Sequence, residues 1–334
     1  MTKTILRSML LVSAAAVLLA GTPEADAQDA RKLRGSIRID GSSTVYPVTE
    51  AVAESFKEVS PNVKVTVGVS GTGGGFKRFA ANEIDISDAS RPIKAKEAST
   101  CKEAGIEFVE IPVAYDGLTI VVNKENDWVD SITVDDLKRI FLTDDPAATW
   151  QDVRSEWPAI PIAIYSPGTD SGTFDYFKEV VAGKKGMIRS DMSVSEDDNI
   201  LVRGVAGDKG SIGFFGVAYY LVNKDKVRAL PVVNADGRAV MPESTTIENG
   251  AYNPFSRPLF IYVNARSARK PHVRAFVEYF LETAPTAAAS VGYVGLPPEL
   301  YGRAKKAFKE RRNGSQYLNP DGSAKHGALS DIYR

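Results

Sequence analysis

Short apolar runs alternate with amphipathic stretches from residue 36 to about residue 300. The pattern predicts a strand over Ser36–Asp40, a second over Val63–Val69, where apolar residues take alternate positions, and a third that begins at Ile84. A helix is predicted between the first two strands because apolar residues recur at helical spacing, at Val48, Val52, Phe56 and Val59. Strands that alternate with helices are typical of an α/β fold with parallel strands and crossover helices.

Two longer runs, Tyr115–Asn123 and Pro258–Asn264, are rich in Val, Ile and aromatic residues, and each follows a corner marked by proline. We interpret them as strands that cross between two lobes. Lobe I would then be built from both ends of the chain, residues 28–113 and 257–334, and lobe II from residues 114–256. The basic, glycine-containing segment after Tyr301 is predicted to form a helix followed by a surface extension.

The N-terminus has the layout of a secretory signal. Lys3 and Arg7 make a basic start, an apolar stretch runs from residue 9 to 19, and small residues end at Ala27. The apolar stretch is shorter than the roughly 20 residues that span a bilayer. We therefore predict a signal over residues 1–27, cleavage after Ala27, and a soluble chain exported to the periplasm.

The overall charge is nearly balanced, with 41 Lys and Arg residues against 42 Asp and Glu residues. This balance gives no reason to expect a nucleic acid or a membrane surface as a partner. Cys101 is the only cysteine, so no disulfide framework is possible, and we expect it to be buried. His272 and His326 are too few for a histidine-rich metal site. No metal or cofactor is expected.

Three loops of similar composition each lie between a predicted strand and a predicted helix: Gly41–Thr44, Ser70–Gly74 and Asp170–Thr173. A helix start leaves about four N–H groups unpaired and carries partial positive charge, and small residues let an anion approach it. Three such starts that converge could hold a tetrahedral oxyanion. The alternative is that these residues are ordinary helix caps and turns.

The same loops also resemble enzyme motifs, but the further residues that those enzymes need are missing from the chain. The glycine loop has Phe76 before Lys77 and Arg78 after it, unlike a nucleotide-binding P-loop. Asp170–Thr173 has the letters of an aspartic protease signature, but the chain has no second copy. An exported hydrolase that uses Asp170 or Ser171 is a less favoured alternative, and a structural or adhesive protein without a convergent site is another.

Several motifs, in this order, resemble the periplasmic phosphate-binding proteins of the high-affinity phosphate ABC transporter. They are Ile37–Pro47, Ser70–Phe76, Asp85–Pro92, Ile132–Leu137, Asp170–Thr173, Ile212–Gly216 and Ser256–Phe260. The resemblance covers nearly all of the exported chain. It implies a non-enzymatic type II periplasmic binding protein fold, two mixed sheets flanked by helices and joined by two crossing strands. It also implies a monomer that binds phosphate between the lobes and delivers it to membrane permease subunits.

The resemblance also implies a set of ligand-binding residues. Carried over position by position, they are Ser43, Thr44, Val45, Ser70, Thr72, Gly73, Ser90, Arg91, Asp170, Ser171, Gly172 and Thr173.

Two positions depart from the family pattern. Ser90 stands where the family has the Asp that accepts the proton of hydrogen phosphate, and Pro167 stands where it has an Arg. We assign the cation to Arg91, and the carboxylate first to Asp170 and second to Asp197 or Asp198. Since a lost acceptor would relax selectivity, sulfate, molybdate or arsenate remains an alternative ligand.

Overall fold

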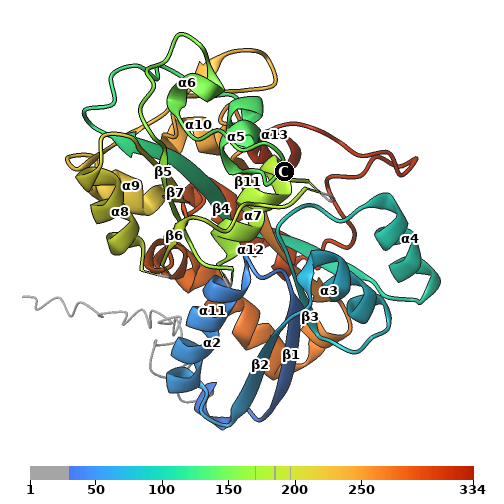
Figure 1. The fold of residues 1–334 in the computed structure, drawn as a ribbon. Coiled ribbons are helices and arrows are strands. Elements are labelled where there is room, and N and C mark those ends of the chain that lie inside the picture. Colours follow the sequence, from blue (N-terminus) through green and yellow to red (C-terminus); the bar gives the residue numbers. More distant parts are fainter. Residues whose placement is uncertain (1–29, 170, 184–185, 196) are drawn as a thin grey trace, which may run out of the picture.

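The computed structural model describes residues 30–169, 171–183, 186–195 and 197–334, so the predicted signal lies outside the described residues. The chain forms a mixed α/β structure in which helices flank a curled sheet (Figure 1). The predicted fold class is confirmed. Across the described ranges, no helix is long and apolar enough to cross a membrane.

The sheet is one hydrogen-bonded path with two halves. Its strands lie in the order β2 (Val63–Val69), β1 (Gly35–Gly41), β3 (Ile86–Ala89), β11 (Ser256–Asn264), β4 (Phe108–Asn123), β7 (Ser211–Gly216), β5 (Ala163–Ser166) and β6 (Ser193–Val194), with β8 (Val227–Ala229) also on β4. Strand β1 is parallel to β2 and β3, and β5 is parallel to β6 and β7. The first half consists of β2, β1, β3 and β11, the second of β7, β5, β6 and β8, and β4 belongs to both. The antiparallel pairs lie where the halves join, since β11 is antiparallel to β3 and β4, and β4 to β7. A separate hairpin joins β9 (Val232–Val233) to β10 (Ala239–Val240).

Strand β4 runs through both halves of the sheet. Its first part pairs with β11, from Phe108 opposite Asn264 to Gly117 opposite Ser256, and its last part pairs with β7 and β8. Every residue of β4 is buried. Both runs predicted as crossing strands are strands, and β4 is the one paired in both halves; it begins at Phe108 rather than Tyr115. The lobe boundaries themselves stay a prediction.

Helices cover each half of the sheet. The first half carries α2 (Tyr46–Val59), α3 (Gly71–Ala80), α4 (Ala95–Glu103), the 3-10 helix η1 (Ser267–Arg269), α11 (Pro271–Ser290) and α12 (Pro298–Lys309). The second half carries α5 (Val134–Phe141), α6 (Trp150–Val153), α7 (Gly172–Val181), α8 (Asp198–Gly207), α9 (Val217–Val222) and α10 (Ser244–Glu248). Helix α2 buries Val48, Val52 and Phe56, as its apolar spacing predicts, and packs against α11. Cys101 on α4 is fully buried, as expected, and burial raises the pKa of its thiol to about 11.

The glycine loop after β2 differs from the expectation. Helix α3 begins at Gly71 instead of near Phe76, so most of the loop is the first turn of the helix. Gly71 has a φ of +74°, which side chains with a Cβ rarely adopt. A Cβ at Gly75 would stand 2.7 Å from the Cα of Gly41. Glycine therefore lets the start of α3 lie directly against the end of β1.

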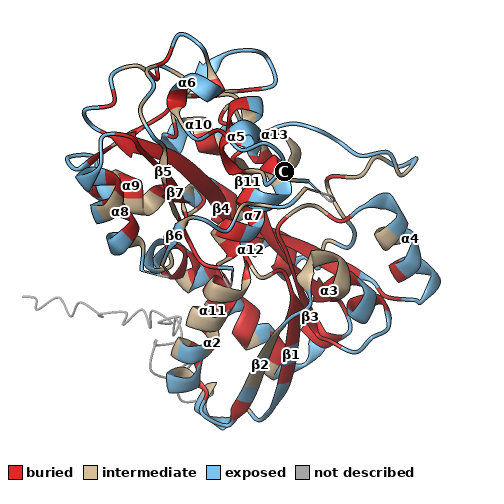
Figure 2. Cartoon of the chain, viewed as in Figure 1, coloured by how far each residue is buried: buried red, intermediate tan, exposed pale blue. Residues whose placement is uncertain are grey.

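The C-terminal tail also differs, because it folds back onto β4 and is not only a surface extension. Ser315 Oγ and the Gln316 N–H donate hydrogen bonds to the buried carboxylate of Glu110. The hydroxyl of Tyr333, just after α13 (Leu329–Ile332), donates to the Glu110 carbonyl over 2.9 Å. Tyr317 and Tyr333 are buried, as is most of the sheet beneath them (Figure 2). The last residues of the chain therefore belong to the core.

Candidate anion-binding site

The ends of three parallel strands meet at one edge of the first half-sheet. Ser42–Thr44 follow β1, Ser70 follows β2, and Ser90 and Arg91 follow β3. The carboxyl ends of parallel strands are where α/β sheets form ligand crevices. The strand order therefore brings together loops that are far apart in the sequence.

The first loop is fixed by its own hydrogen bonds. The Ser42 N–H donates to the carbonyl of Asp88 over 3.0 Å, and the Thr44 N–H donates to Ser42 Oγ over 3.2 Å. Ser42 and Thr44 are 3% and 2% exposed. The loop presents the Thr44 hydroxyl in a defined position.

The second and third loops are joined through hydroxyl groups. The Ser90 N–H donates to Thr72 Oγ1 over 3.2 Å, and the Thr72 and Ser90 hydroxyls lie 3.2 Å apart. Ser70 Oγ donates to Asp40 Oδ1 over 2.5 Å. Thr72 and Ser90 thus act as one hydroxyl pair, while Ser70 is engaged behind them.

The fourth loop comes from the other half of the sheet. Ser171 is the N-cap of α7, and its Oγ accepts a hydrogen bond from the Thr173 N–H over 3.2 Å. A Cβ at Gly172 would stand 2.7 Å from the Cα of Thr44, so only glycine allows this approach of α7 to the first loop. Asp170, the preferred carboxylate of the sequence analysis, lies outside the described residues.

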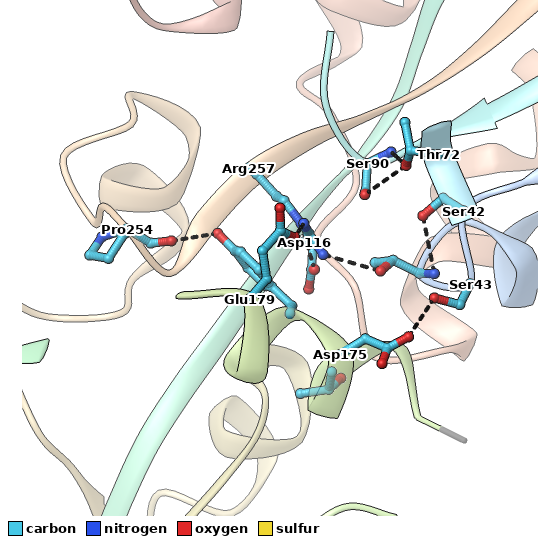
Figure 3. A network of polar contacts seen from close by, with 12 residues as sticks. Ser42, Ser43, Thr72, Ser90, Asp116, Asp175, Glu179, Pro254 and Arg257 are labelled. Atoms are coloured by element: carbon cyan, nitrogen blue, oxygen red, sulfur yellow. Dashed lines mark hydrogen bonds and ion pairs between the residues drawn. The ribbon is translucent and has the colours of Figure 1, made fainter. Parts of the chain in front are cut away.

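A cavity of about 260 Å³ lies between the first three loops and helix α7. Figure 3 shows the polar network around it. It is lined by Ser42, Ser43, Thr44, Gly71, Thr72, Gly73, Ser90, Arg91, Asp175, Glu179 and Arg257. Six expected ligand residues are in this set, Ser43, Thr44, Thr72, Gly73, Ser90 and Arg91. The other described ones, Val45, Ser70, Ser171, Gly172 and Thr173, are not among the lining residues. Val45 is fully buried in the core.

Arg257, which the sequence analysis did not assign, is the cation at the centre of the network. It lies at the start of β11, and its side chain is only 14% exposed. Nη2 donates to Thr44 Oγ1 over 3.1 Å, and Nη1 donates to Glu179 Oε2 over 2.9 Å. The guanidinium also stacks 3.5 Å from the ring centroid of Tyr176. A charged residue at the start of an apolar strand was the available signal, since burying a charge requires partners.

Asp116 forms an ion pair with Arg257. The two residues are direct cross-strand neighbours on β4 and β11, and Nε lies 3.3 Å from Asp116 Oδ2. Burial raises the pKa of Asp116 to about 6, although the charge of Arg257 lowers it. The second oxygen, Oδ1, is buried without a hydrogen-bond partner in the described structure. Asp116 therefore orients the guanidinium but is poorly satisfied itself.

Two carboxylates of α7 also face the cavity. Asp175 Oδ2 accepts a hydrogen bond from Ser43 Oγ over 2.8 Å, and Glu179 binds Arg257. They are four residues apart and so share one helix face. Both contacts connect α7 with the other half of the sheet (Figure 3).

Arg91, the expected cation, lines the cavity but is already paired. Its Nη1 and Nη2 donate to the carboxylate of Glu97 over 2.9 and 2.7 Å, and its guanidinium lies 5.7 Å from the ring centroid of Phe76. Among the alternative carboxylates, Asp197 is the N-cap of α8 and accepts a hydrogen bond from the Asn199 N–H over 2.9 Å. Neither Asp197 nor Asp198 lines the cavity.

The comparisons with known proteins agree with this architecture. A family model described as a PBP superfamily domain matches residues 24–283. The chain belongs to the PBP superfamily.

Relatives and a solved structure extend the match over most of the chain. Protein SphX of Synechococcus elongatus is 49% identical over 92% of this chain and 90% of its own length. Phosphate-binding protein PstS of Staphylococcus epidermidis is 39% identical over 87% of this chain and 88% of its own length. A crystal structure of a possible phosphate binding protein from Planctomyces limnophilus is 43% identical, with a TM-score of 0.81 over 84% of this chain and 99% of that one. The resemblance to phosphate-binding proteins is thereby confirmed.

Proposed function

We propose that this chain is a transport receptor that binds inorganic phosphate in the cavity between the first three loops, α7 and Arg257, and delivers it to the permease of an ABC transporter. One observation carries the proposal. Arg257 and the hydroxyls of Thr44, Thr72 and Ser90 come from four separate segments and line one small cavity. A guanidinium and neutral hydroxyl donors are suited to a tetrahedral oxyanion. The named relatives support phosphate as that anion.

In this proposal Thr44, Thr72 and Ser90 donate hydroxyl hydrogen bonds, and Arg257 supplies the charge. Arg91 takes a secondary part because Glu97 holds it. The start of α7, with Ser171, Gly172 and Thr173, closes over the first loop. Its N–H groups and those of Ser43 and Val45 complete the donor set, with Ser70 and Gly73 as supports. Asp170 stays a proposed neighbour of the anion.

Binding of the anion would be coupled to closure of the two lobes. With lobe I as residues 28–113 and 257–334 and lobe II as residues 114–256, the contacts between the lobes beside the cavity include Arg257 to Glu179, Ser43 to Asp175, and Gly172 to Thr44. A ligand that contacts both lobes binds the closed state preferentially and shifts the population toward it. Residues 1–27 direct export, and the monomeric chain acts in the periplasm without catalysis.

Isothermal titration calorimetry of the mature chain with phosphate tests the proposal. We expect tight binding that weakens by about ten-fold in Thr44→Val and in Thr72→Val, since each loses one hydrogen bond to a charged ligand. Thr100→Val is the matched control, because its hydroxyl bonds the carbonyl of Lys96 on the exposed face of α4. No binding of phosphate, with tight binding of sulfate, molybdate or arsenate, would overturn phosphate as the ligand. Hydrolysis of a peptide or ester that is lost in Ser171→Ala would favour an enzyme instead.

A further inference from the structure

The balanced total charge conceals a separation between the proposed lobes. Residues 28–113 and 257–334 carry 25 Lys and Arg against 18 Asp and Glu, a net charge of +7. Residues 114–256 carry 14 against 22, a net charge of −8. The expectation that no membrane surface is a partner rested on the total alone. The distribution of charge changes that conclusion.

The excess positive charge lies in the C-terminal part of lobe I. Residues 257–334 contain 13 Lys and Arg against 6 Asp and Glu. The exposed cations in or beside η1, the start of α11 and the end of α12 that are not ion-paired in the described structure form what we call the basic face. Its members are Arg266, Arg269, Arg274, Lys305, Lys309 and Arg311. None of these six belongs to an ion pair found within the described residues. Lys270 and Lys306 of the same segments pair with Asp85 and Glu310 and are left out.

Three members of the basic face converge on one hollow. Arg274, Lys309 and Arg311 line a cavity of about 310 Å³ together with Ala268, Glu278 and Phe308. Three cations there face one carboxylate, so the hollow keeps an excess of positive charge. Because the three cations come from α11, from the end of α12 and from the residues after it, the folded structure creates this concentration of charge.

The basic face lacks the apolar centre of a specific protein interface. The exposed large apolar side chains of the described structure are Val69, Met187, Val194, Ile200 and Val222. None lies on η1, α11 or α12. Arg occurs often in specific protein interfaces, but there it surrounds an apolar, aromatic core. A surface of cations without such a core fits a layer of anionic groups better than a shaped protein partner.

We propose that the basic face of lobe I docks on the anionic phospholipid headgroups of a membrane, with the acidic lobe II turned away from it. Each Lys or Arg near an anionic bilayer strengthens binding about five-fold, and the effect falls off within a Debye length of about 8 Å at physiological salt. Opposite charge on the two lobes orients the molecule, because the surface attracts one lobe and repels the other. Docking of this kind concentrates the protein at the membrane without occupying the anion cavity.

Cosedimentation of the mature chain with lipid vesicles tests this inference. We expect binding to vesicles that contain phosphatidylglycerol, none to vesicles of phosphatidylcholine alone, and release by added salt. The triple variant Arg274→Gln, Lys309→Gln and Arg311→Gln should lower the partition coefficient about 100-fold. The control triple Arg203→Gln, Lys209→Gln and Arg238→Gln removes the same charge from exposed positions of lobe II and should not lower it.

Phosphate calorimetry on both triples separates folding and ligand binding from membrane docking, since neither set touches the cavity. Absence of wild-type binding to the vesicles that contain phosphatidylglycerol would overturn the proposal, and would leave an acidic protein as the partner of this face. Equal binding to both vesicle types would overturn it too, because the headgroup charge would then not matter. An equal loss in both triples would overturn it as well, because it would show dependence on net charge alone. Absence of phosphate binding by the wild type would refute the proposed function without affecting vesicle binding.

Discussion

Replacing Arg257 tests whether the cavity has been assigned its correct cation. In Arg257→Gln the side chain keeps hydrogen-bonding ability but loses its charge and its forked geometry. A hydrogen bond to a charged group contributes about 1.5–3 kcal/mol, so the phosphate affinity should fall about 10- to 150-fold. Arg91→Gln is the matched comparison, since both Nη groups of Arg91 already bind Glu97. We expect its affinity to stay within about three-fold of the wild type, because the side chain of Arg91 is 27% exposed, against 14% for Arg257, so solvent screens its charge more strongly.

The same substitution has a separate effect on stability. Asp116 is fully buried and has Arg257 as its cation, so Arg257→Gln leaves an unpaired buried carboxylate. Breaking a buried pair destabilises a protein by about 3–5 kcal/mol. Adding Asp116→Asn should recover much of the free energy of unfolding, measured in urea, but not the phosphate affinity, measured by calorimetry. Recovery of both would show that Arg257 is only structural. A loss of affinity in Arg91→Gln with none in Arg257→Gln would refute the assignment.

Three further outcomes are expected. Glu179→Gln should strengthen phosphate binding several-fold at constant pH, because Glu179 occupies Nη1 of Arg257 in the closed cavity; weaker binding in calorimetry would contradict this. Gly172→Ala should weaken phosphate binding at least about ten-fold, since its Cβ would lie 2.7 Å from the Cα of Thr44 and would oppose closure of the lobes. If small-angle scattering showed the same compaction with phosphate as in the wild type, this prediction would be wrong. Asp88 is fully buried, and burial raises its pKa to about 8, so the native state holds a proton that the unfolded state releases near pH 4. Stability should therefore fall by about 1.4 kcal/mol per pH unit between pH 4 and pH 8 through this group, and thermal unfolding of Asp88→Asn should lack that component.

The fold was largely predictable because its signals are local. Alternation of apolar residues over Val63–Val69 and helical spacing from Val48 to Phe56 both follow from burying one face of each element. The first turn of α3 was missed because glycine-rich segments are typical of loops. The close approach of Gly75 to Gly41 explains why glycine is required where α3 meets β1.

The site was predictable only in part because its decisive contacts are not local. Hydroxyl residues at strand ends, such as Thr44 and Thr72, follow from the strand and helix pattern. Arg257 could not be assigned in this way, because its partners lie 78 to 213 residues away and depend on sheet order. Asp116 within an apolar strand was the complementary signal, and the register of β4 against β11 pairs the two residues.

The position of β11 has a consequence for the order in which the protein can assemble. In the sheet, β11 lies between β3 and β4, although it follows them by more than 130 residues along the chain. Until residues 256–264 are available, β3 has an unpaired edge and the first half of the sheet lacks the strand that joins β3 to β4. Ser315 and Gln316 are needed too, since they satisfy the buried carboxylate of Glu110. The first half of the sheet is therefore completed only by segments more than 130 residues beyond the end of β4, so its folding depends on contacts between residues far apart in the sequence.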